Sequence, residues 1–318
     1  MQLSTLNVSL SQLAESRAEV TTEFGNELGR TAAAVQILLG GADPRSRLIL
    51  EPLLMNPIRG SRAGVVRADF ASLSEHWKAE VWDNYNTKIQ TRFPFANTQE
   101  EVTVPEFAEF FRPDTGILWK FFKANLEARL DKVGDGFAPK PSADPMPFRA
   151  DFLSCLSNAL QITDAIFGTT PEPALQFHIR IHPVGASISE IAFIVDGQAT
   201  VYRNEPERWA PVVWPGKGDP HGGTLQVKGA GFTDEVPRMG DFGLFRLLAA
   251  GGLKPMGQSG GLPVLGASWA MTRTNEAPVT IDFKPTKTVH PFNRDFFHRL
   301  RCPPEVTVGG GAAAGGKR

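Results

Sequence analysis

The sequence predicts an α+β protein with more than one domain: an amino-terminal helical domain over residues 1–170, followed by an antiparallel β-sandwich domain with one packed helix over residues 171–307. Apolar residues recur every three or four positions in the first part and every second position in the second. Glycine follows the same division, since 10 of the 31 glycines precede residue 171 and 21 follow it, and frequent turns need glycine. Residues 308–318 are almost all glycine and alanine, and we expect a disordered tail there.

Several segments of the first domain have the apolar spacing of helices. They cover residues 3–39, 46–55, 66–92, 104–111, 115–131 and 152–168. The first is expected to end at Gly40-Gly41, and the second at Asn56-Pro57. Phe93 precedes Pro94 and is therefore biased out of the helical region, so Phe93-Pro94-Phe95 is expected to be a chain exit held by two aromatic rings.

The short helix that begins after Thr103 carries its own start signal. Glu106 stands three residues after Thr103, which is the spacing of a capping box, and Pro105 lies in the first turn, where a missing N–H costs nothing. This helix presents Phe107, Phe110 and Phe111, which we interpret as core residues.

Alternating apolar and polar residues begin after Thr169-Thr170-Pro171. Strands are predicted over residues 177–181, 187–195, 200–202, 209–213, 223–230, 264–272 and 278–284. Asp196-Gly197 is expected to be the turn of a hairpin. One helix is predicted between the strands, over residues 241–250, and the remaining strands are expected to pair antiparallel in a sandwich.

Composition excludes several classes of function. The chain is 42% hydrophobic and 21% charged with a net charge of −1, which gives no electrostatic footprint for nucleic acid. It contains no apolar stretch long enough to be a transmembrane helix and no signal peptide, so we expect a soluble chain without a targeting segment. Cys155 and Cys302 are interpreted as two separate packed thiols; a bridge stays open, because sequence cannot establish their approach.

Three motifs resemble reactive sites without their structural context. His178 and His182 have the spacing of a zinc helix, but on a strand they stand about 13 Å apart and cannot share an ion. The stretch from Gly257 to Gly261 matches the G-x-S-x-G pattern around Ser259, with Asp282 and His290 in hydrolase order, yet both flanks resemble loop.

The third motif is a glycine-rich stretch over residues 216–223 that lacks the Lys-Ser/Thr ending of a phosphate-binding loop. The sequence therefore predicts no metal, no cofactor and no enzymatic activity. Arg246 is surrounded by apolar residues, and we expect its guanidinium to be buried, bonded to backbone carbonyls or to one carboxylate, and to hold the helix on the sheet.

An ordered set of short motifs resembles the carboxy-terminal periplasmic region of the TssM/IcmF family, the large inner-membrane subunit of the bacterial type VI secretion system. The set comprises Phe93-Pro94-Phe95, Phe107 to Phe111 with Pro113 and Gly116, Asp196-Gly197-Gln198, Tyr202, Trp214-Pro215-Gly216, Phe245 to Leu248, Pro291-Phe292 and Arg301-Cys302-Pro303. It departs from the family at Phe93, where tyrosine is usual, and at Phe242-Gly243, where Trp-Ala is usual.

The resemblance implies a periplasmic scaffold whose β-domain binds an outer-membrane lipoprotein, with other copies of the chain and inner-membrane subunits as further partners. Tyr202 and Trp209 are the candidate partner-binding residues, and structural roles are assigned to Arg246, Trp214, Phe93 and Phe95. One alternative is a module that binds a glycan such as peptidoglycan, suggested by Trp209, Trp214 and Tyr202 near turns; the other is a serine hydrolase using Ser259.

Overall fold

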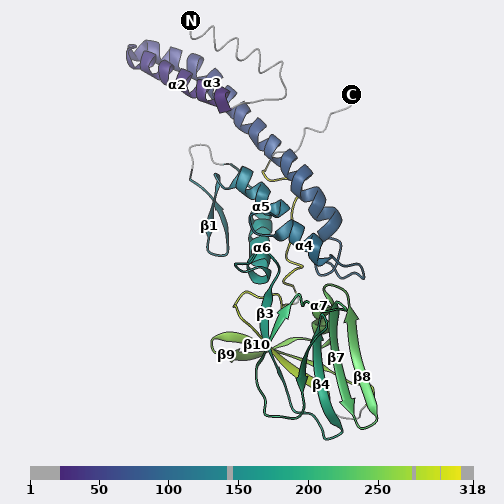
Figure 1. The fold of residues 1–318 in the computed structure, drawn as a ribbon. Helices are drawn as coiled ribbons and strands as arrows, with labels where there is room; N and C mark the ends of the chain where they lie inside the picture. Colours follow the sequence, from purple (N-terminus) through teal and green to yellow (C-terminus); the bar gives the residue numbers. More distant parts are fainter. Residues whose placement is uncertain (1–21, 142–145, 274–276, 294, 309–318) are drawn as a thin grey trace. The chain divides into compact units, whose positions relative to one another are not determined.

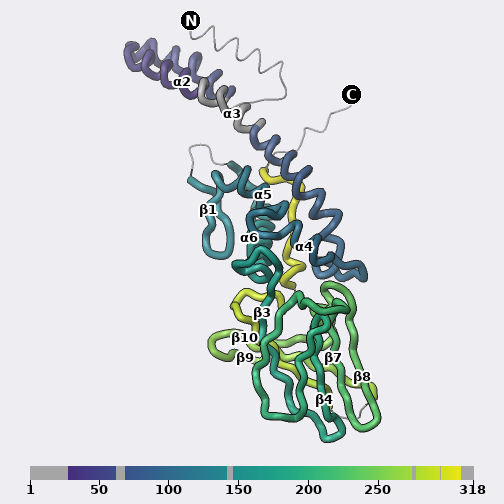
Figure 2. Tube along the Cα trace, viewed as in Figure 1, coloured from purple at the N-terminus to yellow at the C-terminus, as the bar shows by residue number. Residues whose placement is uncertain are grey.

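A computed structural model describes residues 22–141, 146–273, 277–293 and 295–308 (Figures 1 and 2). For residues 22–27 and 62–68 it describes the backbone alone. The chain divides into two compact units. The first unit contains the described residues up to Trp77 together with 141, 146–149 and 305–308. The second contains Lys78–Lys140 and the described residues from Ala150 to Pro304. The predicted tail from 309 and the predicted helix up to residue 21 lie outside the described residues.

The first unit is built on two helices, α2 (Thr22–Gly40) and α3 (Pro44–Trp77). The predicted helix end at Gly40 is confirmed, but the predicted break at Pro57 is wrong, because α3 runs through both Pro52 and Pro57. A proline inside a helix removes a hydrogen bond and clashes with the preceding turn. Packing offsets that cost here, since Met55 and Ile58 are buried beside Pro57 in one core with Leu28, Val35 and Leu39.

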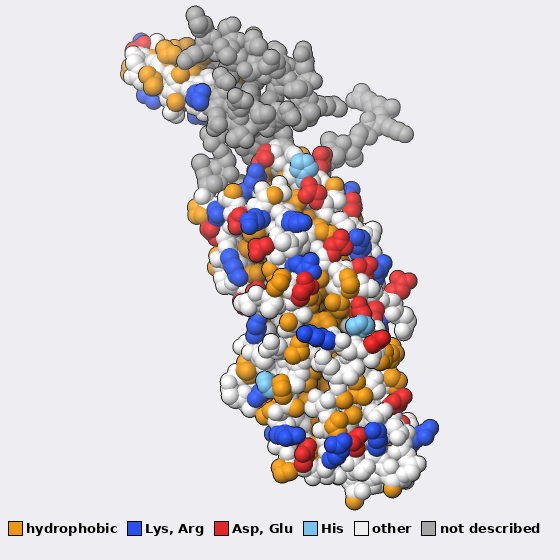
Figure 3. Space-filling view, in the orientation of Figure 1, with side chains coloured by type: hydrophobic (Ala, Val, Ile, Leu, Met, Phe, Trp, Pro, Cys, Tyr) orange, Lys and Arg blue, Asp and Glu red, His pale blue; other side chains and the backbone are white. Residues whose placement is uncertain are grey.

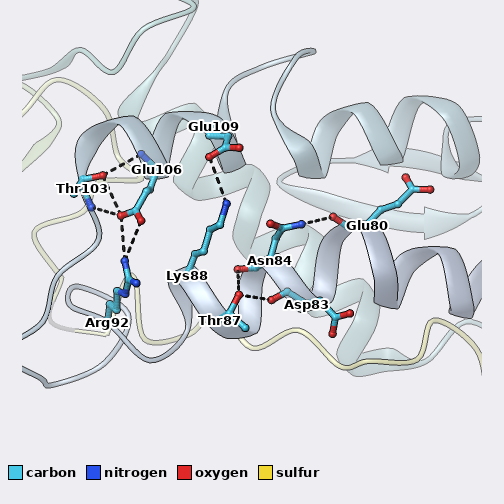
Figure 4. A network of polar contacts seen from close by, with 9 residues as sticks. All are labelled: Glu80, Asp83, Asn84, Thr87, Lys88, Arg92, Thr103, Glu106 and Glu109. Carbon is cyan, nitrogen blue, oxygen red and sulfur yellow. Dashed lines mark hydrogen bonds and ion pairs between the residues drawn. The ribbon is translucent and has the colours of Figure 1, made fainter.

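The second unit begins with helices that contain π-helical turns, η1 (Lys78–Trp82), η2 (Tyr85–Ile89) and, further on, η3 (Phe122–Leu126). In each case a polar side chain bonds the carbonyl four residues earlier: Asn84 to Glu80 at 2.9 Å, Thr87 to Asp83 at 2.7 Å and Asn125 to Phe121 at 3.2 Å. Figure 4 shows the first two contacts. Such side chains compete with the helical N–H for its acceptor, which favours the wider turn.

The capping box predicted at Thr103 is confirmed at the start of α4 (Val104–Phe111). The helix predicted over 115–131 is shorter than expected: α5 (Ile117–Phe121) leads into η3, and the chain then forms a hairpin of β1 (Leu130–Val133) and β2 (Gly136–Pro139). Gly134 adopts a φ of +57°, which favours glycine at the turn of this hairpin. The last helix of this part is α6 (Ala150–Ile166).

The sandwich predicted from the alternating pattern is confirmed. Its strands are β3 (Leu175–Ile181), β4 (Ile188–Val195), β5 (Gln198–Tyr202), β6 (Ala210–Trp214), β7 (Gly222–Gly229), β8 (Phe232–Met239), β9 (Lys254–Ser259), β10 (Leu262–Trp269) and β11 (Val279–Pro285). They form one sheet in the order β6-β3-β11-β10-β9 and another in the order β5-β4-β7-β8, all antiparallel. The predicted helix is α7 (Gly243–Ala250).

Two strands, β8 and β9, were not expected from the sequence. Both lie at the edge of a sheet, and all of β9 except Ser259 is exposed. β9 buries little and so has little reason to alternate apolar and polar residues. The burial of β8 alternates, but Asp234 and Arg238 stand at its less exposed positions, so the apolar periodicity that predicts the central strands is missing at both edges.

Candidate interaction sites

Arg246 on α7 forms what we call the junction, a contact between the sandwich and the loop that precedes α4. The guanidinium bonds the carbonyl oxygens of Thr98 at 3.1 Å and Gln99 at 3.0 Å, and its Nε lies 3.3 Å from an oxygen of Glu101. Its Cζ stands 4.0 Å from the ring centroid of Phe93. The Arg246 side chain is 19% exposed, while the two carbonyl acceptors belong to exposed loop residues, so the junction is partly shielded from water.

Arg246 bonds the predicted kinds of group, backbone carbonyls and one carboxylate, but the prediction that it holds the helix on the sheet is wrong. The carbonyl and carboxylate acceptors belong to residues 98–101 of the helical part and not to the sheet. Sequence could not show this, because the contact joins residues almost 150 positions apart. Asp241 adds a second link by accepting a hydrogen bond from the backbone N–H of Val104 at 2.6 Å.

Aromatic rings continue the junction inward. Phe107 of α4 lies 5.7 Å from Phe242, which in turn lies 5.0 Å from Trp214 of β6. Phe95 and Phe245 both contact Phe297, at 5.5 and 5.3 Å. Because these rings come from the helical part, the sandwich and the carboxy-terminal segment, one apolar core joins all three.

A second candidate site, the Trp209 pocket, lies on the five-stranded sheet. It has a volume of about 420 Å³ and is lined by Arg180, His182, Trp209, Met256, Gln258, Ser259, Val264 and Asp282. These residues come from β3, β11, β9 and β10 and from the loop that follows β5. The pocket thus combines charged groups, an aromatic ring and an apolar wall, as binding sites commonly do.

Charges in the Trp209 pocket are paired around a buried carboxylate. Oδ2 of Asp282 accepts from Arg180 at 2.6 Å and lies 3.0 Å from Nε2 of His182. Glu207 lies 3.2 Å from Nδ1 of the same histidine. The side chain of Asp282 is only 4% exposed, yet its Oδ1 has no hydrogen-bond partner, and neither does Nε of Arg180. Both atoms have essentially no exposed surface, so they are buried polar groups without partners and not open binding positions.

The predicted partner-binding residues lie in different surroundings. Trp209 is half-buried at the surface, with Arg180 Cζ 4.9 Å and Lys284 Nζ 4.5 Å from its ring centroid. Tyr202 is buried, at 6% exposure. Of the residues assigned structural roles, Trp214 and Phe95 are fully buried and Phe93 lies beneath Arg246. Sequence reasoning missed Arg180 as a site residue, because Arg180 is brought beside Asp282 only by the pairing of β3 with β11.

Ser259 does not stand in a nucleophile elbow. The prediction of loop on both sides is wrong, because Ser259 ends β9 and Leu262 begins β10, with Gly260 and Gly261 forming the turn between them. An elbow needs a helix after the serine, and here a strand follows. Within the described part of the chain, no hydrogen bond joins Ser259 to His182, and His290 packs against Phe292 outside the lining of the pocket.

Cys155 and Cys302 form a disulfide, which corrects the interpretation of two separate thiols. The bridge joins α6 to the carboxy-terminal segment, 147 residues along the chain. Nearby, the Tyr85 hydroxyl donates to the carbonyl of Leu300 at 2.7 Å, and the Trp82 indole donates to that of Cys302 at 3.1 Å. Covalent and hydrogen bonds thus hold this segment against the helices.

The helical part followed by a two-sheet sandwich defines the class of protein. The type VI secretion protein IcmF helical domain matches residues 69–171, and the type VI secretion protein IcmF C2-like domain matches residues 177–282. This chain belongs to the TssM/IcmF family of type VI secretion.

Known relatives share this fold at low sequence identity. The type VI secretion system component TssM1 of Pseudomonas aeruginosa is 23% identical over 195 residues, which cover 60% of this chain and 18% of that protein. A chain of a type VI secretion system membrane core complex superposes with a TM-score of 0.79 at 20% identity, over 96% of this chain and 64% of the other. The carboxy-terminal domain of TssM from EAEC gives a TM-score of 0.62 at 23% identity, covering 74% and 98% of the two chains.

These matches cover only part of the longer relatives, and the chain spans about a fifth of the curated one. Among the described residues, no helix combines the length and apolar character needed to cross a membrane. Acidic and basic side chains are interspersed over the visible face of the described residues (Figure 3).

Proposed function

We propose that this chain is a non-catalytic structural part of the type VI secretion membrane complex, a periplasmic scaffold whose β-sandwich binds an outer-membrane lipoprotein. The junction is the observation that supports a scaffold most directly. Hydrogen bonds from Arg246 and a shared aromatic core join the helical part to the sandwich, as expected of a chain that must transmit position between two sets of partners. Inner-membrane subunits and further copies of the chain are the other proposed partners.

The disulfide supports a location in the periplasm. Structural disulfides persist in oxidising compartments, including the bacterial periplasm, and are rare where thiols are kept reduced. The Cys155–Cys302 bridge connects two buried positions, which is typical of a structural bridge. Family membership supports the same location, since the sequence resembles the periplasmic region of the family.

The Trp209 pocket is the part of the sandwich that we propose as the partner site. Its aromatic ring is half-buried, and Met256 on its wall is 63% exposed. Aromatic and methionine side chains with nearby arginine are typical of residues that dominate binding energy.

A matched pair of methionine variants tests this placement. Met256→Ala and Met239→Ala remove the same side chain from exposed edge strands, but only Met256 lines the pocket, while Met239 is 55% exposed on β8. We expect Met256→Ala and Trp209→Ala to raise the Kd for the lipoprotein by about tenfold, and Met239→Ala to leave it unchanged. Isothermal titration calorimetry with purified lipoprotein measures the Kd of each variant. A raised Kd for Met239→Ala alone would indicate that the lipoprotein binds the other sheet.

The alternatives have less support. A glycan platform needs exposed coplanar rings, and Trp214 is fully buried while Tyr202 is 6% exposed. A hydrolase would need Ser259 activated by a base, and Ser259 follows a strand and precedes a hairpin turn. Because Ser259 also lines the Trp209 pocket, Ser259→Ala should weaken lipoprotein binding by no more than the loss of one hydroxyl contact and by less than Trp209→Ala.

A further inference from the structure

The four edge strands of the sandwich are not protected equally. An exposed edge offers unpaired N–H and C=O groups to any other strand, and proteins commonly guard it with proline, lysine, other charges or a bulge. Three of the edges carry such guards. They are β6 with Pro211, β8 with Pro237 and three charged residues, and β9 with Lys254, Pro255 and a register shift opposite it in β10.

The fourth edge, β5, has none of these guards. Its sequence is Gln-Ala-Thr-Val-Tyr, without charge or proline, and it pairs with β4 without a bulge. Gln198 and Ala199 are exposed, while Thr200 and Val201 are half-buried. In Figure 1 the neighbouring strands β4, β7 and β8 follow one another across this sheet. The strand order places β5 on the other side of β4.

The hairpin that carries β5 is held in place. Asp196 at the turn is 1% exposed, and its carboxylate accepts hydrogen bonds from the backbone N–H of Gly216 at 2.7 Å and of Gly222 at 2.8 Å. Both oxygens are therefore used to fix the turn, so β5 is a preformed edge with a fixed register.

The register shows which backbone groups of β5 face outward. The backbone N–H of Asp196, directly after β4, donates to the carbonyl oxygen of Gly222 in β7. Because backbone bonds alternate between the two sides of a strand, the even-numbered residues of β4 bond β7 and the odd-numbered ones bond β5. Gln198, Thr200 and Tyr202 oppose those odd-numbered residues. The N–H and C=O groups of Ala199 and Val201 consequently point away from the sheet.

We propose that β5 pairs antiparallel with β5 of a second copy of this chain, across a twofold axis at Thr200. Ala199 of each copy would then exchange both backbone hydrogen bonds with Val201 of the other, which uses every outward group of the strand. Thr200 would face its own counterpart in a pair without backbone hydrogen bonds. The two four-stranded sheets would become one continuous sheet of eight strands.

Sequence and charge favour a second copy as the occupant. In this register Gln198 faces Tyr202 and Gly197 faces Arg203, so no two like charges meet across the new pair. The contact is isologous and therefore closes after two copies. Five residues bury far less than the roughly 1,000 Å² of a stable interface, so the pairing is transient in dilute solution and strengthened where copies are held together.

Cysteine cross-linking tests the proposed register directly. Only a twofold at Thr200 brings residue 200 of two copies together, with Cα atoms about 4.5 Å apart, which is within reach of a disulfide. Thr200→Cys should form a covalent dimer under mild oxidation, at roughly ten times the yield of Thr233→Cys. Thr233 is a matched control, since it is an exposed threonine on β8, the other edge of the same sheet. The two native cysteines are already bridged and do not compete.

A second variant distinguishes a cross-link formed by β5 pairing from one formed when two molecules collide at random. Ala199→Pro removes an outward N–H but no bond to β4, so adding it to Thr200→Cys should abolish the cross-link while the circular-dichroism spectrum and Tm stay unchanged. Equal dimer yields from Thr200→Cys and Thr233→Cys, or a cross-link that persists with Ala199→Pro in the folded chain, would overturn the proposal. Lipoprotein binding is measured separately, so the proposed function can fail without affecting this result.

Discussion

Two arginines, one at the junction and one in the Trp209 pocket, show how differently the molecule uses the same side chain. Arg246 lies over Phe93 and Arg180 lies near Trp209, so both guanidinium groups have an aromatic neighbour and a carboxylate partner. Arg246 additionally bonds two backbone carbonyls and is 19% exposed, whereas Arg180 bonds carboxylates alone and is 33% exposed.

The difference separates a closed contact from an open one. At the junction the arginine bonds the carbonyls of two exposed loop residues, lies beside Glu101 and covers the Phe93 ring, so its removal would lose several contacts at once. In the pocket Trp209 is half-buried and Met256 is 63% exposed beside an open volume. The first arrangement stabilises the fold, and the second retains capacity for a partner.

The largest expected effect concerns the disulfide between Cys155 and Cys302, which, like the junction, stabilises the fold. Replacing both Cys155 and Cys302 by serine should lower the free energy of unfolding by about 2–5 kcal/mol, because the bridge closes a long loop in the unfolded chain. Urea titration at equilibrium measures the change. A reductant should destabilise the wild type to a similar extent and leave the double variant unaffected; an equal loss in both would show that the bridge is not the cause.

The next effect compares the two arginines directly. Arg246→Ala should cost about 1–3 kcal/mol, because it removes two hydrogen bonds to the carbonyls of Thr98 and Gln99, the ion pair with Glu101 and the contact with the Phe93 ring. Arg246→Lys should restore little of this, since an ammonium lacks the planar fork. Arg180→Ala takes one partner from the buried Asp282 carboxylate, but His182 remains 3.0 Å from the same oxygen, so we expect a smaller loss than for Arg246→Ala.

Thermal unfolding followed by circular dichroism ranks the variants, with shifts of roughly 2–4 °C per kcal/mol for a chain of this size. A larger shift for Arg180→Ala than for Arg246→Ala would reverse the interpretation of which site is closed. A full rescue by lysine would show that charge, and not hydrogen-bond geometry, holds the junction.

The same contrast explains how far the sequence predicts this structure. The central strands and the Thr103 capping box were predictable, because alternation and capping depend on residues close in sequence. The continuation of α3 through Pro57, the disulfide and the partners of Arg246 were not, because each depends on contacts with distant residues. The Trp209 pocket falls in the second group, since it assembles only when four strands and a loop come together.

The smallest expected effect is a pH dependence of the stability that Glu106 contributes at the start of α4 (Figure 4). The backbone hydrogen bond from Thr103, followed by contacts with the Thr103 hydroxyl and Arg92, holds the pKa of Glu106 below its ordinary value of 4.5. A carboxyl with a depressed pKa in the folded state adds stability above its unfolded pKa and loses that stability as the pH falls through the folded one.

Glu106→Gln should therefore lower Tm at neutral pH, and the gap from the wild type should close as the pH falls below 4.5. Glu109→Gln is the matched control on the same helix, because Glu109 forms only an exposed ion pair with Lys88 at 3.7 Å and takes no part in the cap. Its Tm should follow the wild type closely across the whole pH range. A gap for Glu106→Gln that stays constant from neutral to acid pH would mean that ionisation of the carboxyl group is not the cause of the stability difference.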